Sequence, residues 1–371
     1  MKHNTYENWV EIDLEAIRGN IRQIRRIAGC PVMAVIKANA YGHGTIPVAR
    51  AAIEAGSSFF AVARFGEAME IRKAGITAPI LIFGRLGPEN AIQAAAENFR
   101  VTVFCEQQVV EYTEALRNTK QKLIVHAKID TGMGRLGSPA ESGLTLLQMI
   151  QSAPNLETEG LFTHFARSDE LNVNTTDQQL DRFEKLINTL TENGLRPKIV
   201  HTANSAGAIF HPRACQYDMV RGGIAIYGLN PSVQTPLPAG FRPALSWKAE
   251  IISVKAMPAG CGISYGHKYL TKRNGDRIGV IPVGYADGFR RTTGNEVLVG
   301  GKRVPVLGNI CMDQCMIDLN DVPDARPGGE AVLIGRQGND EISADEVAGR
   351  WGSINYEVTC GVSHRVDRIY L

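Results

Sequence analysis

The sequence has no large excess of charge of either sign. It contains 40 Lys and Arg residues and 38 Asp and Glu residues, so the net charge is +2 over 371 residues. It also lacks a block of Lys and Arg that could follow a phosphate backbone, so we expect no nucleic-acid partner. Long apolar runs are missing too, because a run such as 31–36 falls far short of the ~20 residues that a transmembrane helix needs. We therefore expect a globular protein without a membrane anchor.

The N-terminal segment does not have the pattern of a signal peptide. The N-terminal segment carries acidic residues where such a peptide needs an apolar stretch: Glu7, Glu11, Asp13 and Glu15. The composition, with 44% hydrophobic and 21% charged residues, is that of an ordinary globular protein. We therefore expect the protein in the cytoplasm.

Disulfides and metal sites are not expected either. Seven cysteines are an odd number in a chain too large to need disulfides, so reduced thiols are predicted. Cys311 and Cys315 are separated by three residues, but no second Cys or His pair stands nearby at zinc-ligand spacing. The alternation around them predicts instead a strand over 309–318 with both thiols on one face.

From residue 11 to about residue 229, short β-branched runs alternate with stretches of helical period. Strands are predicted at 31–36, 58–61, 79–83, 101–104, 123–129, 160–165, 198–202 and 217–221. Helices are predicted at 14–28, 45–55, 66–74, 88–97, 106–119, 141–151, 176–193 and 205–210. Regular strand–helix alternation implies a parallel sheet, and the number of units over about 220 residues fits a closed, TIM-like (β/α)8 barrel. An open doubly wound sheet is the alternative.

A second domain follows the barrel. Prolines crowd the segment 231–243 and mark a boundary, so we place the barrel at 12–240. The remaining residues, 1–11 and 241–371, are expected to form a mainly-β domain. Its predicted strands are 6–12, 247–257, 277–284, 296–299, 303–307, 310–319 and 331–335.

Local patterns refine this second domain. Gly300-Gly301 predicts the turn of a hairpin. Ser343 is expected to cap a helix over 343–350, with Glu346 completing a capping box. The opening strand 6–12 has no place in the barrel and is expected to pair with the second domain.

Reactive side chains follow the predicted barrel strands, and strand ends are where such barrels carry catalytic groups. Lys37 comes directly after an apolar strand. Burial lowers the pKa of an ammonium group, and a neutral amine can form an imine with an aldehyde. A lysine that merely extends to water is the alternative. The other strand-end residues are Lys128, Asp130, Arg135, His164, His201, Asn204, Ser205 and Arg221.

The loops after the last two predicted strands of the barrel indicate a phosphate-binding site. Ser205 opens a helical stretch, and Gly222-Gly223 permits close approach of a ligand to the backbone. An imine-forming lysine opposite a phosphate site points to pyridoxal 5′-phosphate.

At this point the residues resemble a known family. The segment 34–44 (AVIKANAYGHG) is similar to the cofactor-lysine motif of alanine racemases. The resemblance continues to the end of the chain, in the motifs at 130–137, 163–166, 204–205, 221–228, 264–266, 284–288, 310–314 and 355–357. Other barrel enzymes of this cofactor share the lysine motif, but the second-domain motifs are specific to the racemases.

The resemblance implies a pyridoxal-phosphate-dependent racemase that converts L-alanine to D-alanine for peptidoglycan. It implies a homodimer whose active sites are shared between subunits. Lys37 would be the Schiff-base lysine and one catalytic base, and Tyr265 of the partner subunit would be the other. The residues that match phosphate binders are Tyr41, Ser205, Gly223, Ile224 and Tyr356.

The remaining matches concern the ring and the substrate. Arg221 matches the group facing the pyridine nitrogen, with His164 beside it. Because an arginine stays charged and only donates hydrogen bonds, it would keep that nitrogen unprotonated and weaken the ring as an electron sink. This favours racemisation over transamination and decarboxylation. Arg135 matches a substrate-carboxylate binder, with Met312 and Asp313 from the partner's side.

Lys128 matches a lysine that many family members carry as a carbamate, which positions the substrate-binding arginine. An ion pair with Asp130 or another carboxylate is an equal alternative.

Substrate preference is expected from the tyrosines that would crowd the substrate, Tyr265 and Tyr356. We predict alanine over serine by about tenfold or more, which is ~1.4 kcal/mol. A racemase of serine, or of a broader range of amino acids, is the alternative. The sequence departs from the common family pattern at Asn309, Phe83 and His364, which concerns the substrate channel.

Three other classes fit less well. A barrel-type pyridoxal-phosphate decarboxylase generally places Glu opposite the pyridine nitrogen, where Arg221 stands here. A non-catalytic carrier of the cofactor lacks the second domain. A class I aldolase-type lyase does not need the Tyr265 motif.

Overall fold

The computed structural model describes residues 7–371, and the chain divides into two compact units. One, here called the barrel unit, consists of Ala16–Ala40 and Thr45–Arg242. The other, the β unit, consists of residues 7–15, Tyr41–Gly44 and Pro243–Leu371. The short segment Tyr41–Gly44 therefore lies inside the predicted barrel range in sequence but belongs to the β unit.

The barrel unit is built on a parallel sheet with the strand order β10-β2-β3-β4-β5-β6-β8-β9, as the strand–helix alternation predicts. At the two ends of this order, the amides of Asp218 and Arg221 donate to the carbonyls of Val200 and Ala203, both over 3.0 Å. These bonds join the edges, so the sheet is a nearly closed barrel and not an open doubly wound sheet. The strands are β2 (Val32–Val35), β3 (Phe59–Val62), β4 (Ile80–Ile82), β5 (Phe99–Val103), β6 (Leu123–Asp130), β7 (Ser138–Pro139, paired with β6), β8 (Leu156–Phe162), β9 (Ile199–His201) and β10 (Val220–Gly222).

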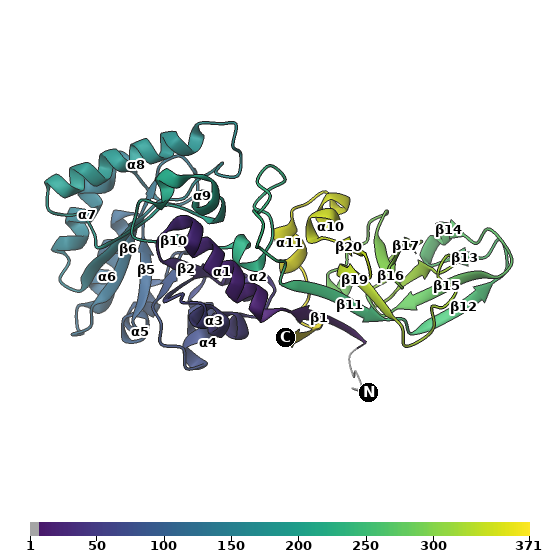
Figure 1. The fold of residues 1–371 in the computed structure, drawn as a ribbon. Coiled ribbons are helices and arrows are strands. Elements are labelled where there is room, and N and C mark those ends of the chain that lie inside the picture. The colour runs from purple at the N-terminus through teal and green to yellow at the C-terminus, as the bar shows by residue number, and fades with distance from the viewer. Residues whose placement is uncertain (1–6) are drawn as a thin grey trace. The chain divides into compact units, whose positions relative to one another are not determined.

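Helices surround these strands (Figure 1). They are α1 (Leu14–Ala28), α3 (Thr45–Glu54), α4 (Phe65–Lys73), α5 (Ala91–Ala96), α6 (Glu106–Leu116), α7 (Gly143–Ser152), α8 (Thr175–Glu192) and α9 (Ser205–Phe210), with short 3-10 turns η1 (Pro88–Asn90), η2 (Ala140–Ser142), η3 (Pro212–Cys215) and η4 (Ile224–Tyr227). Gly29, Gly56, Gly75 and Gly194 follow helices with positive φ, the conformation in which glycine commonly ends a helix. The sixth predicted strand ends at Phe162, so His164 lies just beyond it.

The β unit contains a sheet with the order β12-β15-β18-β17-β16-β19-β11-β1-β21, and β20 pairs with β19. The strands of this sheet are β1 (Asn8–Ile12), β11 (Leu245–Glu250), β12 (Ser253–Met257), β15 (Asp276–Ile281), β16 (Glu296–Val299), β17 (Lys302–Leu307), β18 (Cys315–Asp318), β19 (Glu330–Gln337), β20 (Asp340–Ile342) and β21 (Asp367–Tyr370). Strands β13 (Gly262–Ile263) and β14 (Tyr269–Leu270) form a separate two-stranded sheet. The unit also holds the helices α10 (Ala344–Trp351) and α11 (Asn355–Cys360) and the 3-10 turns η5 (Tyr265–His267) and η6 (Tyr285–Asp287).

Two predictions for this unit are confirmed. Strand β1 pairs antiparallel with β11, so the opening segment joins the second domain, although Tyr6 lies outside the described residues. Strands β16 and β17 form a hairpin in which Val299 faces Lys302, and both turn glycines have positive φ, 58° and 76°. Positive φ at both central positions is the geometry of a type I′ turn.

Two other predictions need correction. The strand predicted over 309–318 is only four residues long, β18, because the amide of Cys311 donates to the carbonyl of Gln314 over 2.9 Å and closes a turn. Cys311 and Cys315 therefore do not share a strand face. In α10, Ser343 Oγ accepts from the amide of Glu346 as predicted, but the Glu346 carboxylate pairs with Arg303 and Arg350. Only half of the capping box forms.

The seven cysteines are free thiols, as predicted. Within residues 7–371 no group of three or more His, Cys, Asp or Glu side chains is arranged to hold a metal ion. In the same residues no helix is both long and apolar enough to cross a membrane.

Candidate active site

Cationic side chains predicted at strand ends gather at one end of the barrel. Burial holds the pKa of His164 well below its usual value, and the charges of Arg221, Arg135, Lys128 and Lys37 lower it further, in that order. One imidazole can respond to four cations only if all of them lie near it, since these interactions fall off steeply with distance. The His164 ring is therefore neutral and central to this group.

Arg221 is almost completely buried at the end of β10, and its donors are nearly all used. Its Nη1 donates to Nδ1 and to the carbonyl of His201, over 2.9 and 3.1 Å. Its Nη2 donates to the carbonyls of Thr163 and Thr202, both over 2.8 Å, and lies 3.2 Å from Nδ1 of His164. The Nε–H has no partner in the part of the chain that the structure describes, so it is the donor left for a ligand. Burial lowers the pKa of Arg221 to about 9, which leaves it charged at neutral pH.

Ser205 and Gly223, two of the residues expected to bind a phosphate, lie within hydrogen-bonding distance, and Ile224 follows Gly223 in the chain. Ser205 is the first residue of α9, and its Oγ accepts from the amides of Gly223 and Ala225 over 2.9 and 3.2 Å. Its own hydroxyl hydrogen has no acceptor among residues 7–371, so the nearly buried Ser205 retains a donor for an oxyanion. Ile224 begins the turn η4, whose first amides have no partner within the turn.

Gly222 and Asn204, which lie near these residues in sequence, have structural roles in packing and helix capping. A Cβ at Gly222 would lie 2.8 Å from Cγ2 of Ile226, so packing inside the barrel requires this glycine. Asn204 caps α9, because its Oδ1 accepts from the amide of Gly207 over 2.9 Å and from Ser168 Oγ over 2.8 Å.

Lys37 begins the segment α2 (Lys37–Tyr41), which is left-handed. The φ angles of the next four residues are 54°, 53°, 52° and 54°, and none of the four is glycine. A left-handed conformation costs a non-glycine residue roughly 1–2 kcal/mol, so such a run is rare outside functional sites. Sequence patterns do not predict this turn, since only Asn39 tolerates the conformation well.

Glu67 holds the first part of this turn. Its Oε1 accepts from the amide of Ala38 over 2.6 Å, and its Oε2 accepts from the amides of Ala63 and Arg64 over 2.7 and 2.9 Å. Glu67 lies in the first turn of α4, where a carboxylate is favoured by the helix dipole. The residue after Lys37 is thus fastened to a rigid helix start. Sequence analysis missed Glu67.

Lys128 is buried near the end of β6. Burial, followed by the charges of Arg135 and Arg221, lowers the pKa of Lys128 to about 8. It makes no ion pair with any described carboxylate. The Asp130 carboxylate instead accepts three backbone amides, each over 2.8 Å, from residues 132, 133 and 134. The ion pair with Asp130 is therefore not formed, and Asp130 shapes the loop that carries the exposed Arg135.

In the β unit, Tyr41 and Tyr356 lie together, with ring centroids 6.1 Å apart. Burial raises the pKa of Tyr41, so the phenol stays protonated and can donate a hydrogen bond. Gly42 and Gly44 pack closely in the same unit: a Cβ at Gly42 would lie 2.0 Å from the carbonyl oxygen of Thr359.

Tyr265 stands on an exposed loop of the β unit. Tyr265 is 71% exposed, and Met312 is 53% exposed. Asn309 Nδ2 donates to the carbonyl of Tyr265 over 2.7 Å, and Ser264 Oγ donates to the carbonyl of Asn309 over 2.5 Å. The amide of Ala286 donates to the carbonyl of Met312 over 3.0 Å. Because Asn309 lies only three residues before Met312, its bond to the Tyr265 carbonyl connects the Tyr265 loop to the segment that carries Met312.

Asp313 is held in the same unit by an ion pair. Its carboxylate lies 2.9 Å from Arg365, which also contacts the buried Asp287 over 3.1 Å. Asp313 thus has a fixed cationic partner.

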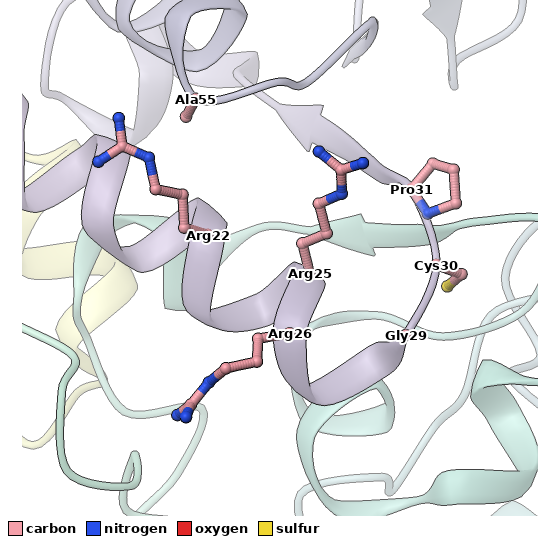
Figure 2. Close-up of a pocket in the computed structure, with 7 residues that line it drawn as sticks. All are labelled: Arg22, Arg25, Arg26, Gly29, Cys30, Pro31 and Ala55. Atoms are coloured by element: carbon pink, nitrogen blue, oxygen red, sulfur yellow. The ribbon is translucent and has the colours of Figure 1, made fainter.

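A cavity of about 480 Å³ lies elsewhere, at the start of β2. Pro31 lines it and precedes β2, whereas Lys37 follows that strand. Arg22 and Arg25 point to one side of α1 and Arg26 points away from them (Figure 2). The other lining residues are Gly29, Cys30 and Ala55. This cavity is separate from the strand-end cluster.

Comparisons with known proteins agree along the whole chain. Residues 12–231 match the family described as "Alanine racemase, N-terminal domain", and residues 244–370 match "Alanine racemase, C-terminal domain". The chain is 46% identical to an alanine racemase of Symbiobacterium thermophilum over 366 residues, which covers 98% of this chain and 96% of that protein. It is 45% identical to an alanine racemase of Geobacillus kaustophilus over 372 residues, with 98% and 94% covered.

Solved structures give the same result. An alanine racemase of Bacillus anthracis, solved with bound L-Ala-P, has a TM-score of 0.93 and 42% identity, covering 99% of this chain and 95% of that one. A histidine racemase of Leuconostoc mesenteroides has a TM-score of 0.91 and 29% identity, covering 99% of both chains. The fold is thus shared by racemases of different substrates, and the chain belongs to the alanine racemase family.

Proposed function

We propose that this protein racemises alanine with pyridoxal 5′-phosphate bound through Lys37. The observation that carries the proposal is the pair of donors left over in the barrel unit, the Nε–H of Arg221 and the hydroxyl hydrogen of Ser205. A pyridine nitrogen needs one donor, and a phosphate needs several, so the residues present fit this cofactor.

The residues that would hold the cofactor come from several elements. Lys37 would bind it covalently, and Arg221 Nε would donate to its pyridine nitrogen. Because Arg221 cannot accept a hydrogen bond, the nitrogen must carry no proton of its own. The neutral His164 lies beside Arg221 and adds no charge there. The groups proposed for the phosphate are Ser205, Gly223, Ile224, Tyr41 and Tyr356.

When bound, the cofactor supplies a conjugated ring that accepts electron density from the substrate Cα. The protein must then take a proton from one face of Cα and supply one to the opposite face. We assign Lys37 to one face and the Tyr265 phenol of the partner subunit to the other. Arg135, whose charge acts on both Lys128 and His164, is proposed to bind the substrate carboxylate, and Met312 and Asp313 are proposed to border it from the partner's side.

Lys128 is proposed to carry a carbamate. Its lowered pKa leaves a fraction of neutral amine at neutral pH, and the amine nitrogen can then form a bond to the carbon of CO₂ with loss of one proton. The resulting anion would pair with Arg135, whose charge already acts on Lys128. Addition of ¹³C-bicarbonate should give a carbamate carbon signal in the NMR spectrum, and Lys128→Met should remove it. If wild type and variant give the same spectrum, Lys128 carries no carbamate.

A homodimer is proposed because Tyr265 and Met312 are too exposed for a buried site within one chain. Tyr285, on the loop hydrogen-bonded to the Met312 segment, is 44% exposed as well. Exposed aromatic and thioether groups gathered on linked loops are typical of a surface that another chain covers. A second copy of this chain would bring Tyr265 to a barrel opening.

Mixing two inactive variants tests the shared site. In a heterodimer of Lys37→Ala and Tyr265→Phe chains, one site carries both changes and the other carries neither. Random exchange of subunits should therefore restore about a quarter of the wild-type activity. If activity stays at the level of the separate variants, Tyr265 does not act across subunits.

Alanine is the proposed substrate because Tyr265 and Tyr356 would leave room for little more than a methyl group. The likeness to a histidine racemase makes a broader substrate range the alternative. Specificity constants for alanine, serine and histidine decide between them. We expect alanine to exceed serine by about tenfold or more.

The central experiment uses L-alanine in D₂O with the purified protein and added cofactor. Loss of optical rotation together with deuterium at Cα is expected. Tyr265→Phe should still exchange the Cα proton of one enantiomer without inverting it, because the base on one face remains. Unchanged optical rotation with wild-type protein would refute the proposed function.

The cellular role is proposed by family resemblance: supply of D-alanine for peptidoglycan, in the cytoplasm. A strain lacking the gene should then need D-alanine for growth. Growth without it would point to a catabolic role or to a second racemase.

A further inference from the structure

A continuous chain of hydrogen bonds runs through the barrel interior to Arg221. Arg100 donates from Nε and Nη2 to the two oxygens of Glu159, over 2.8 and 2.9 Å. Glu159 Oε2 lies 3.0 Å from Nε2 of His126, and Nδ1 of His126 lies 3.0 Å from Nε2 of His201. Nδ1 of His201 receives the bond from Arg221 Nη1 over 2.9 Å. We call Arg100, Glu159, His126 and His201 the histidine relay.

The barrel is built around this relay. Its members come from β5, β6, β8 and β9, which are consecutive neighbours in the sheet. Both imidazole rings are fully buried. The pairing of β6 with β8 shifts register between Val125 and His126, and a Cβ at Gly160 would lie 2.3 Å from Nδ1 of His126. A bulge and a glycine therefore make room for the His126 ring.

The two ends of the relay force the same direction on every bond. At one end, Arg221 can only donate, so Nδ1 of His201 must accept. A neutral His201 then carries its hydrogen on Nε2 and donates it to Nδ1 of His126. His126 in turn carries its hydrogen on Nε2 and donates to Glu159. At the other end the Glu159 carboxylate can only accept, which requires the same arrangement.

A charged imidazole does not fit these bonds. If His201 were protonated on both nitrogens, its Nδ1–H would face the N–H of Arg221. If His126 were protonated on both, His201 would have to accept at Nε2 and carry its hydrogen on Nδ1, with the same clash. The buried rings agree with this, because burial lowers the pKa of both histidines. Bonds to His126 and Arg100 outweigh burial at Glu159 and lower its pKa to about 2, so this carboxylate is an anion.

We propose that the histidine relay positions Arg221 for the ring of the cofactor: the Glu159 anion fixes both tautomers, and His201 therefore presents an acceptor that holds Nη1 and leaves Nε–H for the ligand. This inference rests on the proposed function for its ligand, but the tautomers belong to the protein alone. None of the four relay residues touches the reacting atoms. They are positioning residues that act through Arg221.

The relay also explains how Arg221 is held in place without a carboxylate directly beside it. A chain of hydrogen bonds with one direction is polarised from cation to anion, and each bond strengthens the next in a low-dielectric interior. Phe162 stacks on the His201 ring at 4.8 Å with a 9° angle between planes, which fixes that ring from its face. Arg221 is thus held by the Glu159 anion three hydrogen bonds away, and no carboxylate of the relay stands next to the ligand, where it would stabilise a protonated pyridine nitrogen.

The first test reads the tautomers directly. ¹⁵N-labelled histidine in the whole protein, with and without added pyridoxal 5′-phosphate, gives ring-nitrogen signals that distinguish an acceptor nitrogen from one bearing hydrogen. We expect His126 and His201 to be neutral, with hydrogen on Nε2 in both. A hydrogen on Nδ1 of either ring, or a doubly protonated ring at neutral pH, would overturn the relay, whether or not the protein racemises alanine.

The second test changes the distant anion. In Glu159→Gln the amide nitrogen must face a donor of Arg100 or of His126, so at least one bond is lost together with the charge. The ring signals of His201, two hydrogen bonds away, should shift. Glu111→Gln is the matched control, because Glu111 also pairs with an arginine, Arg85, and its carboxylate side chain is 22% exposed against 17% for Glu159. The control should leave His201 unchanged.

Kinetics give the functional outcome. Loss of a partner that orients a metal ligand costs about 10–100-fold in activity, and we take the same range for a partner that orients Arg221. We expect Glu159→Gln to lower kcat by that factor with little change in KM, and Glu111→Gln to change neither. Unmoved His201 signals, or equal kinetics of the two variants, would refute the relay. If wild-type protein fails to racemise alanine, the proposed function falls and the NMR tests still decide the relay.

Discussion

The left-handed turn after Lys37 can be loosened by changing Glu67, a side chain outside the cofactor-binding set. Glu67→Gln keeps one oxygen and replaces the other with an NH₂ group. If the oxygen takes the place of Oε2, it keeps the bonds to the amides of Ala63 and Arg64, and the NH₂ group then faces the amide of Ala38. Two donors cannot bond, so the Ala38 amide loses its acceptor.

The size of the effect follows from that one bond. A hydrogen bond to a charged group contributes about 1.5–3 kcal/mol, and the lower end applies because Glu67 is only half-buried. A loss of about 1.5 kcal/mol corresponds to roughly tenfold faster exchange of the Ala38 amide hydrogen through local opening. We expect kcat of racemisation to fall as well, because the chain that follows Lys37 is released.

Hydrogen exchange resolved to single residues over 37–44 measures this effect. Glu70→Gln is the control, since Glu70 lies exposed in the same helix α4 and its carboxylate makes no bond or ion pair with the described residues. Equal exchange of the Ala38 amide in the two variants would refute the role assigned to Glu67. Faster exchange with unchanged kcat would show that the turn can loosen without disturbing Lys37.

Four further predictions use other parts of the molecule. Gly19→Ala, in the interior of α1 with nothing within 4 Å of the new Cβ, should raise the free energy of unfolding by about 1 kcal/mol, whereas Gly160→Ala should lower it by about 1–3 kcal/mol because it overlaps His126; urea unfolding checks both. The pKa of Lys128 is about 8 when folded and 10.5 ordinarily, so the unfolded chain binds more protons between these pH values and stability gains up to about 1.4 kcal/mol per pH unit; Lys128→Met should remove that gain in CO₂-free buffer. Arg221→Glu should add a long-wavelength absorbance band and transamination products, and an unchanged spectrum would count against the role of Arg221. Comparable specificity constants for alanine and serine would defeat the predicted substrate preference.

The barrel could be predicted because its strands are buried on both faces. Such strands must be continuously apolar, and the helices between them need only one apolar side, so the two patterns differ clearly in sequence. Helix α1 therefore has the predicted bounds, Leu14–Ala28. The prediction of a strand over 309–318 was wrong because the chain turns within this segment. Its alternation is real, but Gly308 has φ 67° and the bond from Cys311 to Gln314 turns the chain before a strand can start.

The strand-end residues of the candidate site could also be predicted, since their position depends only on where each strand stops. The histidine relay could not, because its partners are far apart in sequence: 59 residues separate Arg100 from Glu159, and 75 separate His126 from His201. One signal was available. His126 stands among the apolar residues of the first part of β6, Leu123 to Ala127, and a polar ring at such a position requires buried partners.

The left-handed turn at α2 could not be predicted from any local sequence pattern. Four consecutive non-glycine residues adopt the left-handed conformation there, and each costs roughly 1–2 kcal/mol. A turn of this kind persists only where both of its ends are held. Glu67 fixes Ala38 within the barrel unit, and close packing fixes Gly42 and Gly44 within the β unit. The lysine proposed to bind the cofactor is therefore followed at once by the passage of the chain from one unit to the other, so its position depends on interactions that each unit makes separately.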